Sequence, residues 1–251
     1  MNSFRADLHI HTLLSPCGDL DMTPDEIVRI AKEKQLSIIG ITDHNTTKHV
    51  SLAKYYAQQC GIFVLGGAEV TTKEEAHCLA FFETDETLQI FDDYLQKYMQ
   101  DIWNDTDKFG YQVQIDKEAN IIYEEPKFLP AAIDQSLEEI EKKVHSLNGL
   151  FIPAHIDKPK TSVPSQLGFI PFDLKIDGVE LSIRATKTDY LLRNRYLKNK
   201  TFIQSSDAHY TNQIGTTYCY FNIEHPSFEE IRKAFIEEDG RNILLKEFVE
   251  K

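Results

Sequence analysis

The sequence predicts an α/β fold in which short apolar strands alternate with amphipathic helices along most of the 251 residues. Runs such as residues 36–45 ("LSIIGITDHN") and 150–156 ("LFIPAHI") have the length and apolar content of buried strands. Between such runs, apolar residues recur with helical spacing. This strand–helix repetition favours a parallel sheet, and the roughly seven strands expected favour closure into a barrel.

The first half of the chain shows this order clearly. Residues 4–10 ("FRADLHI") are expected to form a strand, followed by a helix over residues 22–35. In that helix Thr23 is the expected N-cap, Pro24 the first helical residue, and Glu26 the partner in a capping box. A strand over residues 36–45, a helix over 46–60 that Gly61 ends, and strands over 62–70 and 77–83 follow.

The second half continues the pattern after an interruption. Residues 84–132 are expected to form an insertion, with a long helix over 88–109 and a hairpin over 111–125. Helices are expected over 137–149, 186–199 and 227–238, the last closing the chain, and strands over 150–156, 177–183 and 201–209. Because no Gly/Ser/Pro-rich linker isolates the insertion, residues 1–251 are predicted to form a single domain.

Charge and cysteine content limit the function classes. The chain carries 27 Lys and Arg against 40 Asp and Glu, a formal charge of −13. Such a surface repels phosphate backbones, so we expect no duplex DNA partner. We see neither a secretory leader nor an apolar run that could cross a membrane, so no membrane partner is expected. The 4 cysteines form no CxxC pair, which favours a reduced, cytoplasmic protein.

Side chains that bind metals gather where the predicted strands begin or end. One residue separates His9 from His11, so on a strand both imidazoles leave the same face. Most of the 9 histidines lie at strand ends; His49, His145 and His225 lie on helices or in a loop. Each position alone fits a hydrogen-bonded structural residue, but their convergence without a metal would be hard to satisfy. The metal-type residues at strand ends are His9, His11, His44, Glu69, His77, His155, Asp207 and His209.

These residues occur in the motifs "DLHIH", "TDH", "GAEV", a later His77, "PAH" and "SDAH". The series resembles the PHP (polymerase and histidinol phosphatase) family of metal-dependent phosphoesterases, over most of the chain outside the insertion. The resemblance implies a distorted seven-stranded (β/α)7 barrel of the PHP type. It also implies a centre of two or three divalent ions, commonly zinc, manganese or iron.

The resemblance also implies a division of ligands among three metals. His9, His11, Glu69 and Asp207 would hold the first metal. Glu69 would bridge to a second metal, completed by His77 and His155, and His44 and His209 would hold the third. Imidazoles suit zinc, iron and manganese, and a bridging carboxylate can hold two ions together.

The chain departs from the family at the third site. Where many members have an aspartate or histidine after the second histidine, this chain has "PCG", which places Cys17 there. As a thiolate Cys17 could bind a soft metal such as Zn²⁺. The alternative is a small buried thiol, with Asp19 or water as the ligand.

The expected activity is hydrolysis of a phosphate ester by a hydroxide that bridges two metals, with Glu69 and Asp207 as catalytic carboxylates. Arg184 is the first candidate to bind phosphoryl oxygens and Lys158 the second, although either could be an ordinary surface charge. A small phosphomonoester, a nucleotide phosphate or a short oligonucleotide is the expected substrate. Trp103, Tyr111 and Tyr123 of the insertion could cover a base, or simply pack.

Two other readings remain open. In one, the chain is a catalytically silent metal-binding PHP module that acts as an interaction protein; the eight ligand positions are nevertheless all present. In the other, it is a metal-dependent amidohydrolase, a class that also places "HxH" on the first strand of a barrel. That class usually needs a carboxylated lysine at a later strand end, where this chain has none.

Overall fold

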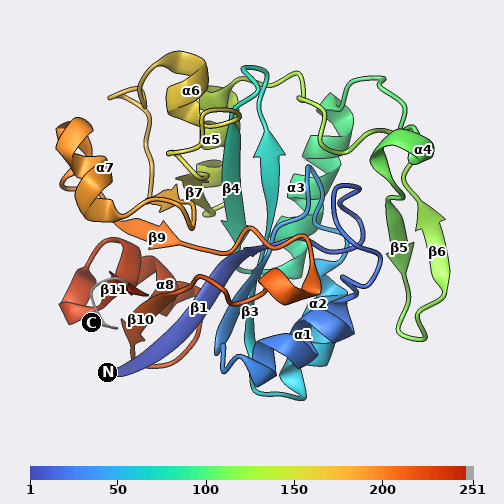
Figure 1. The fold of residues 1–251 in the computed structure, drawn as a ribbon, viewed down its shortest axis with the longest axis horizontal. Coiled ribbons are helices and arrows are strands. Elements are labelled where there is room, and N and C mark those ends of the chain that lie inside the picture. Colours follow the sequence, from blue (N-terminus) through green and yellow to red (C-terminus); the bar gives the residue numbers. More distant parts are fainter. Residues whose placement is uncertain (247–251) are drawn as a thin grey trace.

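The computed structural model describes residues 1–246 and shows a mixed α/β architecture (Figure 1). Its main sheet has 7 strands in the order β11-β10-β1-β2-β3-β4-β7. These strands are β1 (Asn2–Ile10), β2 (Ile38–Ile41), β3 (Phe63–Thr71), β4 (His77–Phe82), β7 (Leu150–Pro153), β10 (Cys219–Ile223) and β11 (Asn242–Leu245). The helices are α1 (Pro24–Glu33), α2 (Val50–Gln58), α3 (Asp85–Tyr98), α4 (Thr106–Phe109), α5 (Leu137–Ser146), α6 (Val163–Leu167), α7 (Lys187–Arg193) and α8 (Phe228–Phe235).

A parallel pair, β8 (Val179–Leu181) and β9 (Phe202–Gln204), continues the curvature of this sheet. The amide of Ile156, just after β7, donates to the carbonyl of Glu180 at 2.8 Å. Beyond β9, the amide of His11 donates to the carbonyl of Ala208 at 2.9 Å, which returns the curve to β1. The predicted α/β fold with a curled seven-stranded barrel-like sheet is therefore confirmed.

The strands are not all parallel, contrary to the prediction. β1 pairs with β2, and β2 with β3, in parallel, but β4 is antiparallel to both β3 and β7. Only a short turn joins Thr71 to His77, and a turn of that length cannot cross the sheet to start a parallel strand. Because of the reversal, the beginning of β4 lies at the same edge as the ends of β1, β2 and β3.

The sequence predicts that the last helix closes the chain, but in the structure a further strand, β11, follows α8. α8 ends at Phe235 and lies in the connection between β10 and β11, an antiparallel pair that extends the sheet beyond β1. Both strands are short, and neither carries a long apolar run, so periodicity alone missed them. The predicted capping box at α1 is also wrong, because the Thr23 side chain makes no cap bond and Glu26 pairs with Arg29 instead.

The insertion contains the predicted hairpin and a shorter helix than predicted. β5 (Val113–Ile115) and β6 (Ile121–Glu124) pair antiparallel, while α3 ends at Tyr98 rather than at residue 109. In Figure 1 this hairpin and α7 lie at opposite ends of the long axis. Among residues 1–246, no helix is both long and apolar enough to cross a bilayer.

Tight packing between strands fixes the edge from which the site is built. A Cβ on Gly40 in β2 would lie 2.1 Å from the carbonyl oxygen of Leu8 in β1. Any larger residue would therefore push β2 away from β1. In the second half of β1 the apolar side chains of Ala6, Leu8 and Ile10 are fully buried. This packing holds the ends of β1 and β2 in a defined relation to each other.

Candidate metal centre

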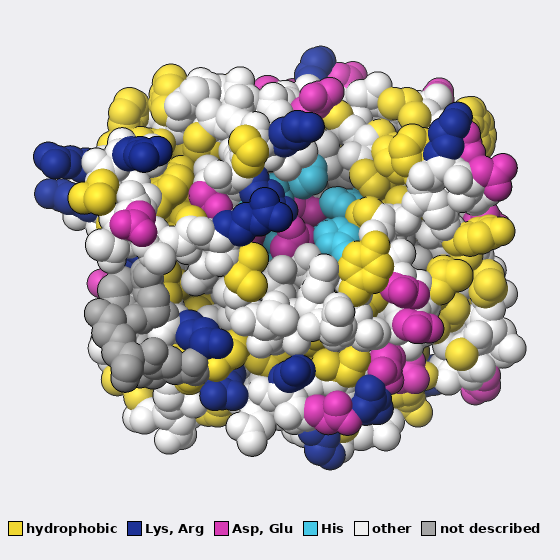
Figure 2. Space-filling view, viewed as in Figure 1, with side chains coloured by type: hydrophobic (Ala, Val, Ile, Leu, Met, Phe, Trp, Pro, Cys, Tyr) yellow, Lys and Arg dark blue, Asp and Glu magenta, His cyan; other side chains and the backbone are white. Residues whose placement is uncertain are grey.

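The predicted ligands converge at one edge of the sheet. His9 lies in β1 and His11 directly after it, His44 follows β2, Glu69 lies in β3, and His77 begins β4. His155 follows β7, and Asp207 and His209 follow β9. All are buried or nearly so, and Figure 2 shows histidine and acidic side chains on the floor of a hollow. The structure thus brings together residues from six strands or the loops after them.

Glu69 lies at the middle of this cluster. Its Oε1 lies 2.8 Å from His77 Nδ1 and 2.9 Å from His155 Nε2. Its Oε2 lies 3.1 Å from His44 Nδ1 and 3.4 Å from His11 Nε2. Burial raises the pKa of Glu69, but the imidazoles of His77, His9 and His44 outweigh it and hold the pKa well below its usual range. An ionised carboxylate with both oxygens facing imidazoles can bridge two cations.

The orientation of His9 and His11 fits a bound cation. His9 Nδ1 donates to the Glu180 carboxylate at 3.0 Å, and His11 Nδ1 donates to Ser15 Oγ at 2.9 Å. In the neutral rings these bonds leave lone pairs on the two Nε2 atoms, which lie only 3.1 Å apart. Two lone pairs at this distance repel each other unless a positive charge lies between them.

The protonation equilibrium of His9 agrees with this conclusion. Burial alone lowers its pKa, but the carboxylates of Glu180, Asp207 and Glu69 overcome burial and raise the pKa well above 6.5. The surroundings of His9 Nε2 therefore favour positive charge, which either a proton or a metal cation can supply. Since imidazole and carboxylate oxygen are ordinary ligands of zinc, iron and manganese, these residues fit a metal centre.

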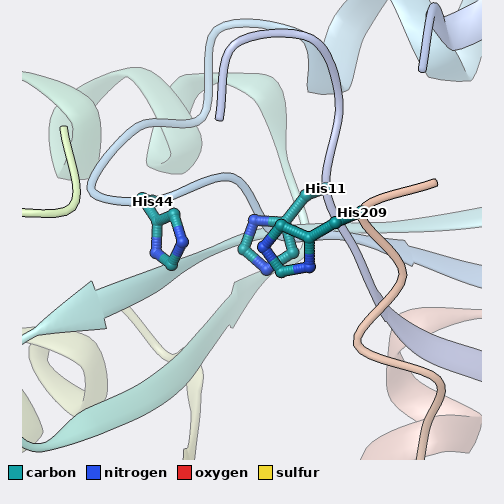
Figure 3. A group of neighbouring side chains, drawn as sticks. All are labelled: His11, His44 and His209. Atoms are coloured by element: carbon teal, nitrogen blue, oxygen red, sulfur yellow. The ribbon is translucent and has the colours of Figure 1, made fainter. Parts of the chain in front are cut away.

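The predicted ligands include three overlapping groups, and within each group the potential ligand atoms all lie within 4.8 Å of one another. The groups are His9, His11, Glu69 and Asp207; His44, Glu69 and His77; and His11, His44 and His209. In the third group the rings of His11 and His209 stack with centroids 4.1 Å apart, and Figure 3 shows His44 beside them. His155 joins the cluster through its contact with Glu69.

Two ligands have unusual backbone conformations. His155 has φ 29° and Asp207 has φ 52°, in the left-handed region that residues other than glycine rarely adopt. Asp7 holds the backbone beside Asp207 in place, because the Asp7 carboxylate accepts from the amide of Ser206 at 2.9 Å and from its hydroxyl at 2.6 Å. Strained residues of this kind persist where neighbouring contacts hold them, often at functional sites.

A cavity of about 630 Å³ opens beside Asp207. Lys158, Lys160 and Arg184 line it, and Lys158 also pairs with the Asp207 carboxylate. Figure 2 shows Lys and Arg side chains beside the hollow that contains the histidines. The structure therefore places both predicted substrate residues, Arg184 and Lys158, in one cavity next to the ligand cluster.

Cys17 lies beside His44 and is not among the residues that line this cavity. Its Sγ lies 3.4 Å from His44 Nε2, and the side chain is exposed. The loop that carries Cys17 is anchored to the loop of His209, because the Asp19 amide donates to the His209 carbonyl at 2.9 Å. Asp19 contributes this backbone bond, whereas its side-chain oxygen accepts from the amide of Asp21.

Two residues that support the ligands were missed in the sequence. Glu180 is buried and accepts both from His9 Nδ1 and, at 3.0 Å, from the amide of His155. His49, which we had set apart as a helix residue, is buried and hydrogen-bonded to Thr12. A carboxylate within the apolar strand "GVELS" was a usable signal, because a buried charge needs a partner. His49 carried no such signal, since its partners come from distant segments.

Comparison with known proteins agrees with this geometry. The PHP domain family matches residues 7–156, and the chain belongs to this family. The uncharacterized protein YqxK of Bacillus subtilis is 26% identical over an alignment of 275 residues, gaps included. The alignment covers 97% of this chain and 65% of YqxK. The chain thus spans less than two thirds of this relative.

Solved structures share the fold. A lesion-specific endonuclease from Pyrococcus furiosus, PfuEndoQ, superimposes with a TM-score of 0.75 at 23% identity, covering 96% of this chain and 58% of its own. A two-domain Bacteroides vulgatus protein, which contains a predicted PHP-like metal-dependent phosphoesterase, has a TM-score of 0.56 at 17% identity. It covers 97% of this chain and 65% of its own.

The expectation that this chain excludes duplex DNA is corrected by one of these structures. Endonuclease Q has been solved with a 27-mer duplex that carries an abasic lesion at the active site, and its TM-score to this chain is 0.74 at 22% identity. Net charge was a poor guide, because it averages over the whole surface. Three basic residues, Lys158, Lys160 and Arg184, line the cavity beside the ligand cluster against two aspartates, Asp157 and Asp207, although the overall charge is −13.

The contact between Glu180 and His9 leads to a prediction about metal affinity. In Glu180→Gln an amide group replaces one oxygen that accepts from His9 or His155, so His9 loses its fixed orientation. We expect affinity for Zn²⁺ or Co²⁺ to fall roughly 10- to 100-fold, the usual effect of removing such a partner. Titration with a competing chelator measures this. Glu230→Gln, which alters a buried carboxylate paired with Arg241, is the matched control and should leave metal affinity unchanged.

Proposed function

We propose that this chain hydrolyses phosphate esters at a centre of two or three metal ions. One observation carries the proposal: both oxygens of the ionised Glu69 face histidine nitrogens, three at Oε1 and two at Oε2 within 3.4 Å. A carboxylate in this position supports a bridging role between ions, as the PHP resemblance implies. The three basic residues that line the cavity beside it, Lys158, Lys160 and Arg184, support a phosphorylated substrate.

In this proposal His9, His11, Glu69 and Asp207 hold one ion, Glu69 with His77 and His155 a second, and His44 with His209 a third. When bound, such ions lower the pKa of water towards neutrality and polarise a phosphoryl oxygen. The chain's own part is to orient the ligands. Glu180 orients His9, Ser15 orients His11, and Asp7 holds the segment of Asp207.

Arg184 and Lys158 complete the site by binding the non-bridging oxygens of the substrate. Arg184 is exposed at the cavity, and its guanidinium can bind two phosphoryl oxygens at once. Lys158 is half-buried and its ammonium contacts Asp207, which places a positive charge directly beside a ligand. Both side chains are thus available to stabilise charge that develops on the phosphoryl group.

The substrate class has two candidates. A small phosphomonoester or a nucleotide phosphate fits a cavity of about 630 Å³. The phosphodiester of a DNA strand is favoured by the fold similarity to endonuclease Q, which extends over 96% of this chain. Both candidates use the same centre. We further propose a cytoplasmic location, which the four free cysteines support.

The central prediction concerns His9 and His11. The double variant His9→Ala, His11→Ala removes two ligands of one proposed ion, so hydrolysis should fall to background while the protein stays folded. The measurement is phosphate release or strand cleavage after loading with Mn²⁺, Zn²⁺ or Fe²⁺. Substrates are histidinol phosphate, nucleoside mono- and bisphosphates, short oligonucleotides and a duplex with an abasic site.

The matched control is His225→Ala, an exposed histidine in a loop before α8, which should keep full activity. Unchanged turnover in the double variant would rule out the proposed centre. No hydrolysis of any substrate by metal-loaded wild-type protein would instead support a metal-binding module without catalysis.

The role of Arg184 gives a separate prediction. Arg184→Gln removes a cation from the cavity without touching a ligand, so we expect weaker substrate binding with unchanged metal content. The loss should be seen as a rise in KM or a fall in kcat/KM of roughly tenfold or more, the scale of a lost charged hydrogen bond. Steady-state kinetics and elemental analysis measure the two effects. Equal kinetics for Arg184→Gln and wild type would make Arg184 a surface charge.

We also propose that the Cys17 thiolate is a ligand of the third ion, with His44 and His209. Zinc and cobalt accept thiolate readily, whereas manganese prefers oxygen ligands, so the third site should favour the softer ions. With Co²⁺ bound, wild-type protein should show a near-ultraviolet thiolate-to-cobalt charge-transfer band that Cys17→Ser lacks. Cys60→Ser, which alters a thiol outside the cluster, should keep the band. Identical spectra and stoichiometry in Cys17→Ser would show that the thiol binds no metal.

A further inference from the structure

The insertion is fastened to the loop that carries His44. The side chain of Asn45 donates to the carbonyls of Leu129 and Ala131 at 2.7 and 2.9 Å. The hydroxyl of Thr46 and the amide of Thr47 both donate to Asp92 at 2.8 Å. These bonds join the residues that follow a proposed ligand to α3 and to the end of the insertion.

Two more contacts extend this attachment to the β5–β6 segment. Lys48 pairs with Glu125, which follows β6, at 2.9 Å. The amide of Ile115, in β5, donates to His49 Nε2 at 3.1 Å. Every residue from Asn45 to His49 therefore contacts the insertion.

The contact with Ile115 fixes the protonation of His49. Because Nε2 accepts a hydrogen bond, the proton of the neutral ring must be on Nδ1. Nδ1 lies 2.7 Å from Thr12 Oγ1 and donates to it, and Thr12 Oγ1 donates in turn to Asp43 Oδ2 at 2.7 Å. Burial lowers the pKa of His49 to about 4, so the ring is neutral at ordinary pH.

A second series of bonds leads from Asp43 to a proposed ligand. Ser15 Oγ donates to Asp43 Oδ1 at 2.7 Å and accepts from His11 Nδ1 at 2.9 Å. A carboxylate only accepts, so both hydroxyls must point towards Asp43 and each must accept from its histidine. The proton of His11 is thereby held on Nδ1, and Nε2 faces Glu69 and Asp207.

We propose that His49 is a positioning residue that couples the β5–β6 hairpin to the metal centre through Thr12, Asp43, Ser15 and His11. Each bond in this series is between 2.7 and 3.1 Å, and its direction is determined by its neighbours. The β5–β6 hairpin then contributes to the orientation of a proposed metal ligand, although it supplies no ligand itself. Displacement of the hairpin weakens the hydrogen bonds that orient His11, and metal binding at His11 strengthens the hydrogen bonds that hold the hairpin.

This coupling can be measured in wild-type protein, because coupling between two sites is reciprocal. Zn²⁺ should slow hydrogen exchange of the Ile115 amide by at least about fivefold, the lower end of common site-to-site coupling. Thr12→Val removes the hydroxyl between His49 and Asp43 but leaves Ser15 and His11 in contact. In Thr12→Val the Zn²⁺ effect on the Ile115 amide should disappear. No Zn²⁺ effect in wild type, or an equal effect in both proteins, would overturn the proposal.

Variants of His49 test the same coupling from the hairpin side. His49→Leu removes the donor to Thr12 and the acceptor of Ile115, so Co²⁺ affinity should fall roughly tenfold or more although residue 49 touches no ligand. His49→Gln can restore both bonds through its amide and should recover part of the loss.

His145→Gln is the matched control, since His145 is a half-buried histidine bonded to Glu141 and Asp177 away from this series. It should leave Co²⁺ affinity unchanged. Equal Co²⁺ affinity in His49→Leu and wild type, with both proteins folded, would contradict the coupling. The inference rests on the metal centre proposed above, but none of these measurements needs catalysis. Failure of the coupling therefore leaves the proposed hydrolysis untouched, and absence of hydrolysis leaves the coupling testable.

Discussion

The buried carboxylate of Glu69 is the constraint on which the rest of the centre depends. An ionised carboxylate without water is costly unless positive charge or donors surround it. Here the compensation comes from imidazoles that four different segments deliver: His9 and His11, His44, His77, and His155. The carboxylate contacts a side chain from each of these segments, so the buried charge is compensated only where the fold brings all of them together.

Each imidazole is in turn oriented by a group behind it. Glu180 holds His9, and Ser15 with Asp43 holds His11. This second layer of hydrogen bonds determines which ring nitrogen faces the cluster, and so whether an imidazole can bind a metal at all. The insertion reaches this layer through His49, although it supplies none of the proposed ligands.

Much of this arrangement could be predicted from the sequence, because the signals are local. Alternating strands and helices predicted the α/β class, and ligands at strand ends predicted their convergence. His77 was informative despite standing at the beginning of a strand, and the antiparallel direction of β4 explains why it reaches the same edge. The single-domain organisation and the division of ligands among three ions remain predictions.

The remainder depended on contacts between distant residues, which no local pattern reveals. The bond from Ile115 to His49 joins positions 66 apart, and the bond from His9 to Glu180 joins positions 171 apart. β10 and β11 were missed because both are short and are placed by antiparallel pairing with β1 and with each other, which local periodicity does not reveal. The exclusion of duplex DNA failed for a related reason: total charge says nothing about where Lys158, Lys160 and Arg184 gather.

The return of the curled sheet to β1 has a consequence for the stability of the folded chain. Outside the ligand cluster, this junction is held by few bonds, among them those between His9, His11 and Ala208 and those from Asp7 to Ser206, 199 positions apart. An ion held by His9, His11 and Asp207 would tie the two sides of the junction like a removable cross-link. Because these ligands come together only in the folded chain, such an ion would stabilise the folded state by mass action, reversibly and in response to metal supply. The same ligands would then govern both the chemistry and the cohesion of the fold.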